Sequence, residues 1–285
     1  TLSFSLKNSY PDCTVKELLE EHLLIPRKIR HFLRTKKHLL INGKMINWQS
    51  LVKTGEDSLI FDDDDYPQKE IPFGQAELVD CLYQDEHLII VNKPEGMKTH
   101  GNEPNEIALL NHVSAYVGQN VYVITPFRQW KLAELFMFAK NPFCLPILNR
   151  LLENKDIARE YWALVQGKFE PKHQVFQDKI GRDRHDRRKR VIDAKNGQTA
   201  LTIVDRLKVF PNGTLVKCRL KTGRTHQIRV HLSAHNHAII GDPLYSKIPA
   251  KRLMLHAHKL SFTHPFTLEK ISVEAKSQTF EAGLS

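Results

Sequence analysis

Residues 221–245 read KTGRTHQIRVHLSAHNHAIIGDPLY, a stretch dense in arginine and histidine among apolar residues. We interpret the part around His226 and His231 as a strand, following an expected strand over residues 213–221. Because side chains of a strand alternate between its faces, two histidines five residues apart project to opposite sides. This spacing argues against a shared metal ion, so structural roles are expected for both histidines.

Strand patterns surround this stretch, and helices are fewer. REYWALVQGKF, residues 159–169, alternates like a strand, and LFMFA, residues 135–139, reads as a buried one. The other expected elements are strands at 88–91, 199–206 and 252–263 and helices at 105–118 and 144–153. Because strands dominate and long helices do not regularly alternate with them, the pattern predicts a mixed α+β domain around a mainly antiparallel sheet.

Three separated segments carry a family resemblance: NKPEGMKTHGN at 92–102, REYWALVQGKF followed by IGRDRHDRRKR at 180–190, and residues 221–245 followed by LMLHAHKLSFTHP at 253–265. Together they resemble the RluA-class RNA pseudouridine synthases over roughly residues 80–280. The resemblance implies an enzyme that isomerises uridine in RNA, breaking its nitrogen–carbon glycosidic bond and rejoining the turned base through carbon. The nucleotide would be flipped out of its helix to react.

The resemblance fails at one decisive place. In this family an aspartate acts as nucleophile or base within a motif reading roughly HRLDxxTSG, before an apolar strand and the residues FAKN. Here FAKNP is present at 138–142, and counting back places Gln129 at the aspartate position. Residues 125–134 contain no aspartate, and their ten consecutive departures between matching flanks favour a block replacement, natural or engineered. A glutamine amide has no ionisable oxygen and is a poor nucleophile.

Two partners of the missing aspartate remain. Tyr161 matches the family's active-site tyrosine, which packs against the base, and Arg229 matches the arginine that pairs with the aspartate. With Gln129 in place of the acid, Arg229 is expected to be a buried cation without its counter-ion. Removing one partner of a buried pair costs roughly 3–5 kcal/mol.

Residues 13–62 read as a small helix–helix–hairpin module. Thr14 can cap a first helix, Pro26 opens a second, and Asn42-Gly43 predicts a tight hairpin turn. Ile29, Phe32 and Leu33 would form the apolar side of the second helix. The order resembles the RNA-binding module first known from a ribosomal small-subunit protein. Its basic side is predicted to contact phosphates through Arg27, Lys28, Arg30, Arg34, Lys36 and Lys37.

The larger domain has basic residues of its own, and the densest run is 180–190. Arginine at this density after a strand indicates phosphate contact. The predicted RNA-binding residues here are Lys93, Arg182, Arg184, Arg187, Arg188, Lys189, Arg190 and Arg224. Residues 63–77, acidic and carrying two prolines, would link a module at 1–62 to a synthase-like domain at 78–285.

The composition narrows the partners. A net charge of +10 and a pI near 9.4 favour a polyanion. Four distant cysteines without a CxxC pair indicate free thiols in a reducing cytoplasm. His256 and His258 would share a strand face without a third ligand, so neither metal nor cofactor is expected. No apolar run approaches the roughly 20 residues of a membrane span, and we expect a cytoplasmic monomer without a membrane partner.

Three functions are compatible with these residues. The preferred one is a protein that binds ribosomal or transfer RNA on a pseudouridine synthase scaffold without isomerising uridine. The second is an active uridine isomerase in which another group replaces the aspartate. The third is an RNA chaperone or assembly factor that uses the same surface without chemistry. Whether the chain is an enzyme therefore depends on Gln129, and the sequence favours the answer no.

Overall fold

The computed structural model describes residues 2–36, 39–45, 47–55, 58–63, 69–124, 135–153 and 157–284. The segment 125–134 with Gln129, as well as Lys37 and residues 64–68 of the predicted linker, lies outside the described residues. The chain forms two compact units, residues 1–157 with 262–271 and residues 158–261 with 272–285. The predicted boundaries near residues 62 and 78 stay a prediction.

The first helices of the N-terminal module form as the capping pattern predicts. The Thr14 hydroxyl accepts the Glu17 N–H at 3.2 Å and starts α1 (Val15–Glu17), which continues as the π-helical turn η1 (Leu18–His22). Helix α2 (Arg27–Lys36) follows Pro26 and buries Leu33. Phe32, expected on the same side of the helix as Leu33, is 37% exposed.

The module's strands form two small antiparallel sheets. Asn42 and Gly43 have φ angles of +49° and +77°, the left-handed pair that a two-residue hairpin turn requires. One sheet has the order β1-β6-β3-β4, and β2 pairs with β5 in the other. Their bounds are β1 Leu2–Lys7, β2 Cys13–Thr14, β3 Leu39–Ile41, β4 Lys44–Met45, β5 Leu51–Val52 and β6 Ser58–Asp63.

The same unit contains a further sheet of order β7-β8-β10-β9, in which all pairs are antiparallel. Its central β10 is buried at every residue, as an apolar LFMFA run requires. Residues preceding this sheet are held by helix α3, where Asn111 Nδ2 donates to the Pro72 carbonyl at 2.8 Å. The bounds are η2 Ala76–Leu78, β7 Asp80–Gln84, β8 Leu88–Asn92, α3 Leu109–Val117, β9 Tyr122–Val123, β10 Leu135–Ala139 and α5 Cys144–Glu153.

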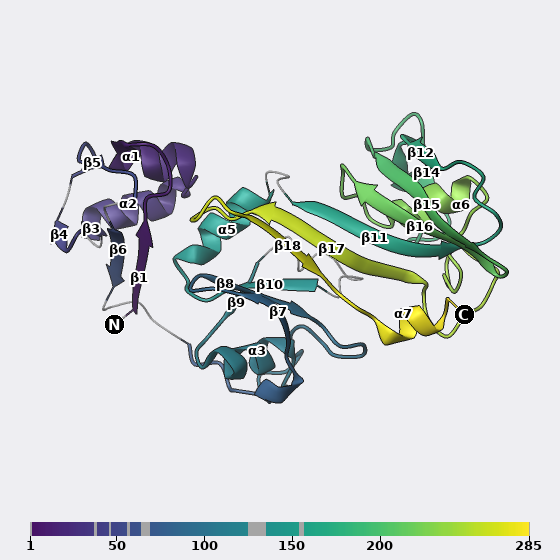
Figure 1. The fold of residues 1–285 in the computed structure, drawn as a ribbon, viewed down its shortest axis with the longest axis horizontal. Coiled ribbons are helices and arrows are strands. Elements are labelled where there is room, and N and C mark those ends of the chain that lie inside the picture. The colour runs from purple at the N-terminus through teal and green to yellow at the C-terminus, as the bar shows by residue number, and fades with distance from the viewer. Residues whose placement is uncertain are drawn as a thin grey trace. The chain divides into compact units, whose positions relative to one another are not determined.

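A six-stranded antiparallel sheet of order β12-β15-β16-β11-β17-β18 organises the second unit. Figure 1 shows its long strands β11 and β17 side by side. The mixed α+β architecture with a mainly antiparallel sheet is therefore confirmed. The bounds are β11 Ala158–Val165, β12 His173–Phe176, β13 Ile180–Arg182, β14 Arg190–Ile192, β15 Thr202–Phe210, β16 Gly213–Leu220, α6 Gln227–Ala234, β17 Leu255–Thr263, β18 Lys270–Glu274 and α7 Gln278–Ala282.

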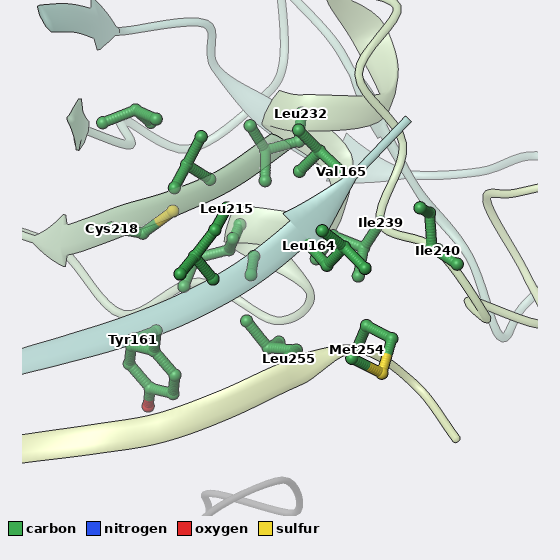
Figure 2. Packing of buried hydrophobic residues seen from close by; sticks show 14 of the residues in the cluster. Tyr161, Leu164, Val165, Leu215, Cys218, Leu232, Ile239, Ile240, Met254 and Leu255 are labelled. Carbon is green, nitrogen blue, oxygen red and sulfur yellow. The ribbon is translucent and has the colours of Figure 1, made fainter. Parts of the chain in front are cut away.

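The hydrophobic core of this unit packs on β11 and β16. Leu164, Leu215 and Met254 belong to it, and Tyr161 lies at one end of the cluster (Figure 2). Figure 2 shows the Tyr161 hydroxyl oxygen turned away from the labelled aliphatic side chains. Helix α6 contributes Ile228 and Leu232 to the same core.

The strand expected around His226 and His231 is wrong. His226 adopts a left-handed φ of +57° in the turn that follows β16, and helix α6 starts at the next residue. Residues 227–232 are all buried, the polar Gln227, Arg229 and His231 as well as the apolar residues between them. The alternation of apolar and polar residues resembles a strand, but tertiary contacts bury both sets in a helix.

Candidate active site and nucleic-acid interface

Tyr161 is placed by the middle of the six-stranded sheet. It stands on β11 opposite Cys218 of β16 and Ala257 of β17. Its side chain is buried, and burial raises the pKa of its hydroxyl, although the charge of Arg159 acts in the opposite direction. The hydroxyl is therefore neutral at physiological pH and suited to packing and hydrogen bonding rather than to proton abstraction.

Arg159 lies two residues before Tyr161, so it shares that face of β11. Burial lowers the pKa of its guanidinium. A Cβ on Gly223 would lie 3.2 Å from Arg159 Nη2, so the glycine of the KTGR segment leaves the space that this side chain needs. Arg159 is not among the site residues predicted from the sequence, although its spacing from Tyr161 in REYW was the available signal.

Arg229 has a counter-ion, so the expected unpaired cation is wrong. Its Nε and Nη2 donate to Asp242 Oδ2 and Oδ1, both at 2.7 Å. Arg229 is 6% exposed and Asp242 is 2% exposed, so the two form a buried, bidentate ion pair. Burial alone would raise the pKa of Asp242, but hydrogen bonds from Arg229 and from the Leu244 N–H hold it below its usual value. Arg229 is thus neutralised without any residue from 125–134.

The loop that brings Asp242 to α6 depends on a glycine. Gly241 has a φ of +80°, and a Cβ there would collide with the Arg252 carbonyl oxygen. Asp242 Oδ1 also accepts the backbone N–H of Leu244 at 3.0 Å and of Tyr245 at 3.3 Å. The Gly241–Tyr245 turn therefore forms around the carboxylate that neutralises Arg229.

Tyr245 connects this turn to the basic segment. Its hydroxyl accepts the Arg190 N–H at 2.7 Å and lies 2.9 Å from His226 Nδ1. The Arg229 guanidinium lies over its ring, 5.1 Å from the centroid. One side chain thus joins the hairpin β13–β14, the start of α6 and the buried ion pair.

Buried polar contacts hold α6 on β15. Gln227 Nε2 donates to Thr202 Oγ1 at 3.0 Å, and Thr202 lies 2.8 Å from His231 Nδ1. His231 Nε2 donates to the Asp178 carbonyl at 2.8 Å, so Nδ1 is the acceptor in a neutral ring. Burial lowers the pKa of His231, which agrees with this assignment. The structural role expected for His231 accounts for all of these contacts.

The basic loop between β13 and β14 contains cations of two kinds. Arg188 Nη2 pairs with Asp186 Oδ2 at 2.8 Å, and hydrogen bonds from Arg188 lower the pKa of Asp186 to about 2. Arg182, Arg184 and Arg187 are exposed, and the ion pairs of the described residues do not include them. Phosphate contact by these three arginines stays a prediction.

The other predicted cations divide in the same way. Arg30 pairs with Glu20, and Lys93 Nζ donates to the Met97 carbonyl at 2.8 Å, so both have partners within the fold. Arg224 Nε donates to the Thr199 carbonyl at 2.8 Å. Arg27, Lys28 and Arg34 are exposed on α2, and the side chain of Lys36 lies outside the described residues.

The histidines of β17 have local partners. His256 Nε2 donates to the Ala275 carbonyl at 2.9 Å, and His258 stacks on Trp162 with ring centroids 3.8 Å apart. Within the described ranges, no three His, Cys, Asp or Glu side chains gather as metal ligands would. The helices of those same ranges include none long and apolar enough to cross a bilayer.

Two sequence families match the chain in separate regions. The RluD ribosomal pseudouridine synthase N-terminal domain matches residues 2–57, and the RNA pseudouridylate synthase domain matches residues 135–234. YhcT of Bacillus subtilis, an uncharacterised RNA pseudouridine synthase, is 35% identical over 84% of this chain and 81% of its own length. Ribosomal large subunit pseudouridine synthase D of Neisseria meningitidis serogroup A is 32% identical over 84% of this chain, which spans 65% of that relative.

A solved structure shows the same fold at lower identity. Human RNA pseudouridylate synthase domain containing 1 superposes with a TM-score of 0.59 at 22% identity, over 73% of this chain and 86% of the human one. The antiparallel architecture is therefore shared with that protein.

Proposed function

The chain belongs to the RNA pseudouridine synthase family, and from this premise we propose that it binds ribosomal or transfer RNA without isomerising uridine. The observation that carries the proposal is the absence of aspartate from residues 125–134, where Gln129 stands at the position of the family's catalytic acid. Loss of a nucleophile or base removes most of an enzyme's rate even when binding survives.

The environment of Arg229 supports this reading. If Arg229 could pair only with an aspartate at position 129, it would have no partner when that aspartate was replaced by glutamine. Here Asp242 accepts hydrogen bonds from Nε and Nη2 of Arg229, both at 2.7 Å, so with Gln129 at the aspartate position the fold contains no buried unpaired charge at Arg229. Tyr161 and Arg229 are accordingly proposed as remnants of the active site.

The charge distribution supports RNA as the ligand. Exposed arginines that form no ion pair with the described part of the chain stand at 182, 184 and 187, and exposed Arg27, Lys28 and Arg34 lie on α2 of the module. Such cations attract phosphates and release counter-ions on binding. Four free cysteines support a reducing, cytoplasmic setting, and we propose that the chain acts as a monomer.

Isomerase activity is the second candidate, favoured by the 35% identity to a relative named as an RNA pseudouridine synthase. It requires another group to act in place of the aspartate. An RNA chaperone or assembly role is compatible with the preferred proposal, because it needs the binding surface alone.

Incubation with bulk ribosomal and transfer RNA, followed by a chemical probe for pseudouridine, separates the two candidates. We expect no product from the unmodified chain and retention of the RNA on a filter. The matched comparison restores the family motif through Pro126→His, Phe127→Arg, Arg128→Leu, Gln129→Asp, Leu132→Thr, Ala133→Ser and Glu134→Gly. Product from this variant alone supports loss of catalysis on an intact scaffold, whereas product from the unmodified chain refutes it.

A further inference from the structure

The N-terminal module has a groove that is separate from the proposed active-site remnants, since neither Tyr161 nor Arg229 lines it. Its walls come from the start of the first helix, from α2 and from the segment after β4. Leu33 and Leu39 form a buried apolar floor, and Met45, 62% exposed, stands at its edge together with half-buried Trp48. The exposed Met45 and the half-buried Trp48 leave apolar surface in contact with water, and a planar apolar ligand would relieve this contact.

The segment that carries Trp48 is fixed in the free protein. The Trp48 carbonyl accepts the Lys16 N–H at 3.0 Å, and Asn47 Oδ1 accepts the Gln49 N–H at 2.9 Å. Ser50 N–H closes the turn on the Asn47 carbonyl at 3.1 Å. Because its backbone is already ordered, this segment loses little conformational entropy when a ligand stacks on Trp48.

The rim of the groove is cationic. Its carboxylate, Glu20, is already paired with Arg30. Lys16 and Arg34 also line the groove, both are exposed, and the described ion pairs include neither. A ligand that fits must therefore combine a flat apolar part with negative charge.

We propose that this groove binds an unpaired nucleotide of RNA, its base stacked on Trp48 and its phosphates beside Lys16 and Arg34. The inference rests on the proposed RNA binding and adds a preference for single-stranded or bulged RNA, because bases inside a duplex cannot offer a face to Trp48. The exposed amides of Asn47 and Gln49 lie where they can meet a base edge.

The test measures the affinity of the full chain for a 12-nucleotide oligouridine and for a 12-base-pair RNA duplex. Trp48→Leu keeps an apolar side chain but removes the stacking ring, whereas Trp48→Phe keeps a ring. Phe32→Leu is the matched control, because Phe32 is an exposed aromatic residue of the same module outside the groove. We expect Trp48→Leu to weaken oligouridine binding about 5- to 100-fold, the range for loss of one stacked base. Trp48→Phe and Phe32→Leu should stay within about threefold of the unmodified chain, and duplex binding should change little.

The outcomes distinguish this inference from the function on which it rests. If RNA binding depends on salt but Trp48→Leu and Trp48→Phe bind oligouridine equally well, the base site is overturned while RNA binding stands. The groove would then bind a partner of another kind. Absence of binding to every RNA overturns both. Circular dichroism of each variant identifies unfolding. If Trp48→Leu does not fold, Trp48→Phe decides the question through fluorescence. Oligouridine that quenches tryptophan fluorescence equally in the unmodified chain and in Trp48→Phe overturns stacking on Trp48.

Discussion

At the scale of single residues, the buried pair Arg229–Asp242 changes what the missing aspartate means. An arginine buried to this degree needs a counter-charge, and the turn after α6 supplies one through Asp242. The cation therefore persists as part of the fold, whatever residue stands at position 129.

We predict that Asp242→Ala lowers the free energy of unfolding by about 3–5 kcal/mol, because it leaves Arg229 buried and unpaired. Chemical denaturation measures the loss. The double variant Arg229→Met with Asp242→Leu should be markedly more stable than Asp242→Ala, since it buries no charge. A double variant as unstable as the single one would show that the pair's charge is not the cause.

The buried position of His87 leads to a prediction of how the free energy of unfolding depends on pH. Its ring packs edge-on against Phe4 and Phe266, with centroids 5.1 and 4.8 Å away. Burial lowers the pKa of His87, while Asp85 opposes the shift and His264 reinforces it. Burial alone would raise the pKa of Asp85, but the His264 ring and the backbone N–H groups of His87 and Leu88 hold it well below its usual value.

Both shifts act with the same sign. A histidine with a lowered folded-state pKa is neutral in the fold but takes up a proton in the unfolded chain near pH 6.5, so its contribution is complete above that pH. The free energy of unfolding should therefore fall as the pH drops below about 6.5, with a further loss in strong acid as Asp85 protonates. His87→Phe keeps the packing and should flatten the decline between pH 6.5 and 5. Parallel curves for both proteins would rule out His87 as the titrating group.

At the scale of elements, the hairpin β13–β14 presents cations on a loop that the fold already orders. Asp183 Oδ1 accepts the N–H groups of His185 and Asp186 at 2.8 and 3.1 Å. Of its arginines, Arg188 is engaged by Asp186 within the loop, whereas Arg184 and Arg187 project without such a partner. The arginines of the loop are thus not equivalent, because Arg188 is paired within the loop.

We predict that Arg184→Ala and Arg187→Ala each reduce the slope of log affinity for RNA against log salt by about one, as loss of one phosphate contact does. Arg188→Ala is the matched control in the same loop and should change the slope less, because its charge is already offset. Equal effects of all three substitutions would show that the internal pair opens on binding.

Tyr245 links this hairpin to α6, and its hydroxyl is the link that can be removed alone. Tyr245→Phe leaves the Arg190 N–H without its acceptor and His226 without its partner at Nδ1. A fully buried group without its partner costs about 1–3 kcal/mol, and these half-buried groups should cost less. We expect faster amide hydrogen exchange at Arg190 and a severalfold weaker affinity for RNA. Unchanged exchange at Arg190 would exclude the link.

At the scale of the whole molecule, the net charge of +10 arises in the second unit, which has 23 Lys and Arg against 10 Asp and Glu, whereas the first unit has 19 against 22. Basic residues nevertheless gather at two places, on the α2 surface and in the 183–189 loop. Binding by phosphate contacts at both places predicts a steep dependence on ionic strength. With six phosphate contacts the affinity for ribosomal RNA should fall about a thousandfold between 50 and 200 mM salt. Filter retention measures this fall, and a flat dependence would argue against electrostatic RNA binding.

Much of the fold follows from local pattern. The buried LFMFA run gives β10, Asn42-Gly43 gives the hairpin turn, and the Thr14 cap starts the first helix. In each case neighbouring residues determine the conformation, through apolar burial, φ preference or a cap. The absence of aspartate from 125–134 is likewise a property of the sequence alone.

Other features were decided by contacts between distant segments. Helix α6 has a strand-like pattern but is buried at residues 227–232, where tertiary contacts override local preference. Asp242 reaches Arg229 because a glycine turn reverses the chain, and His264 reaches Asp85 across 179 residues. An ion pair forms only where the fold brings two charged side chains into hydrogen-bonding contact. The pattern of residues along the chain does not reveal which distant residues come that close. The sequence by itself determined the scaffold and the missing acid, and only the tertiary structure showed that Arg229 is neutralised without it.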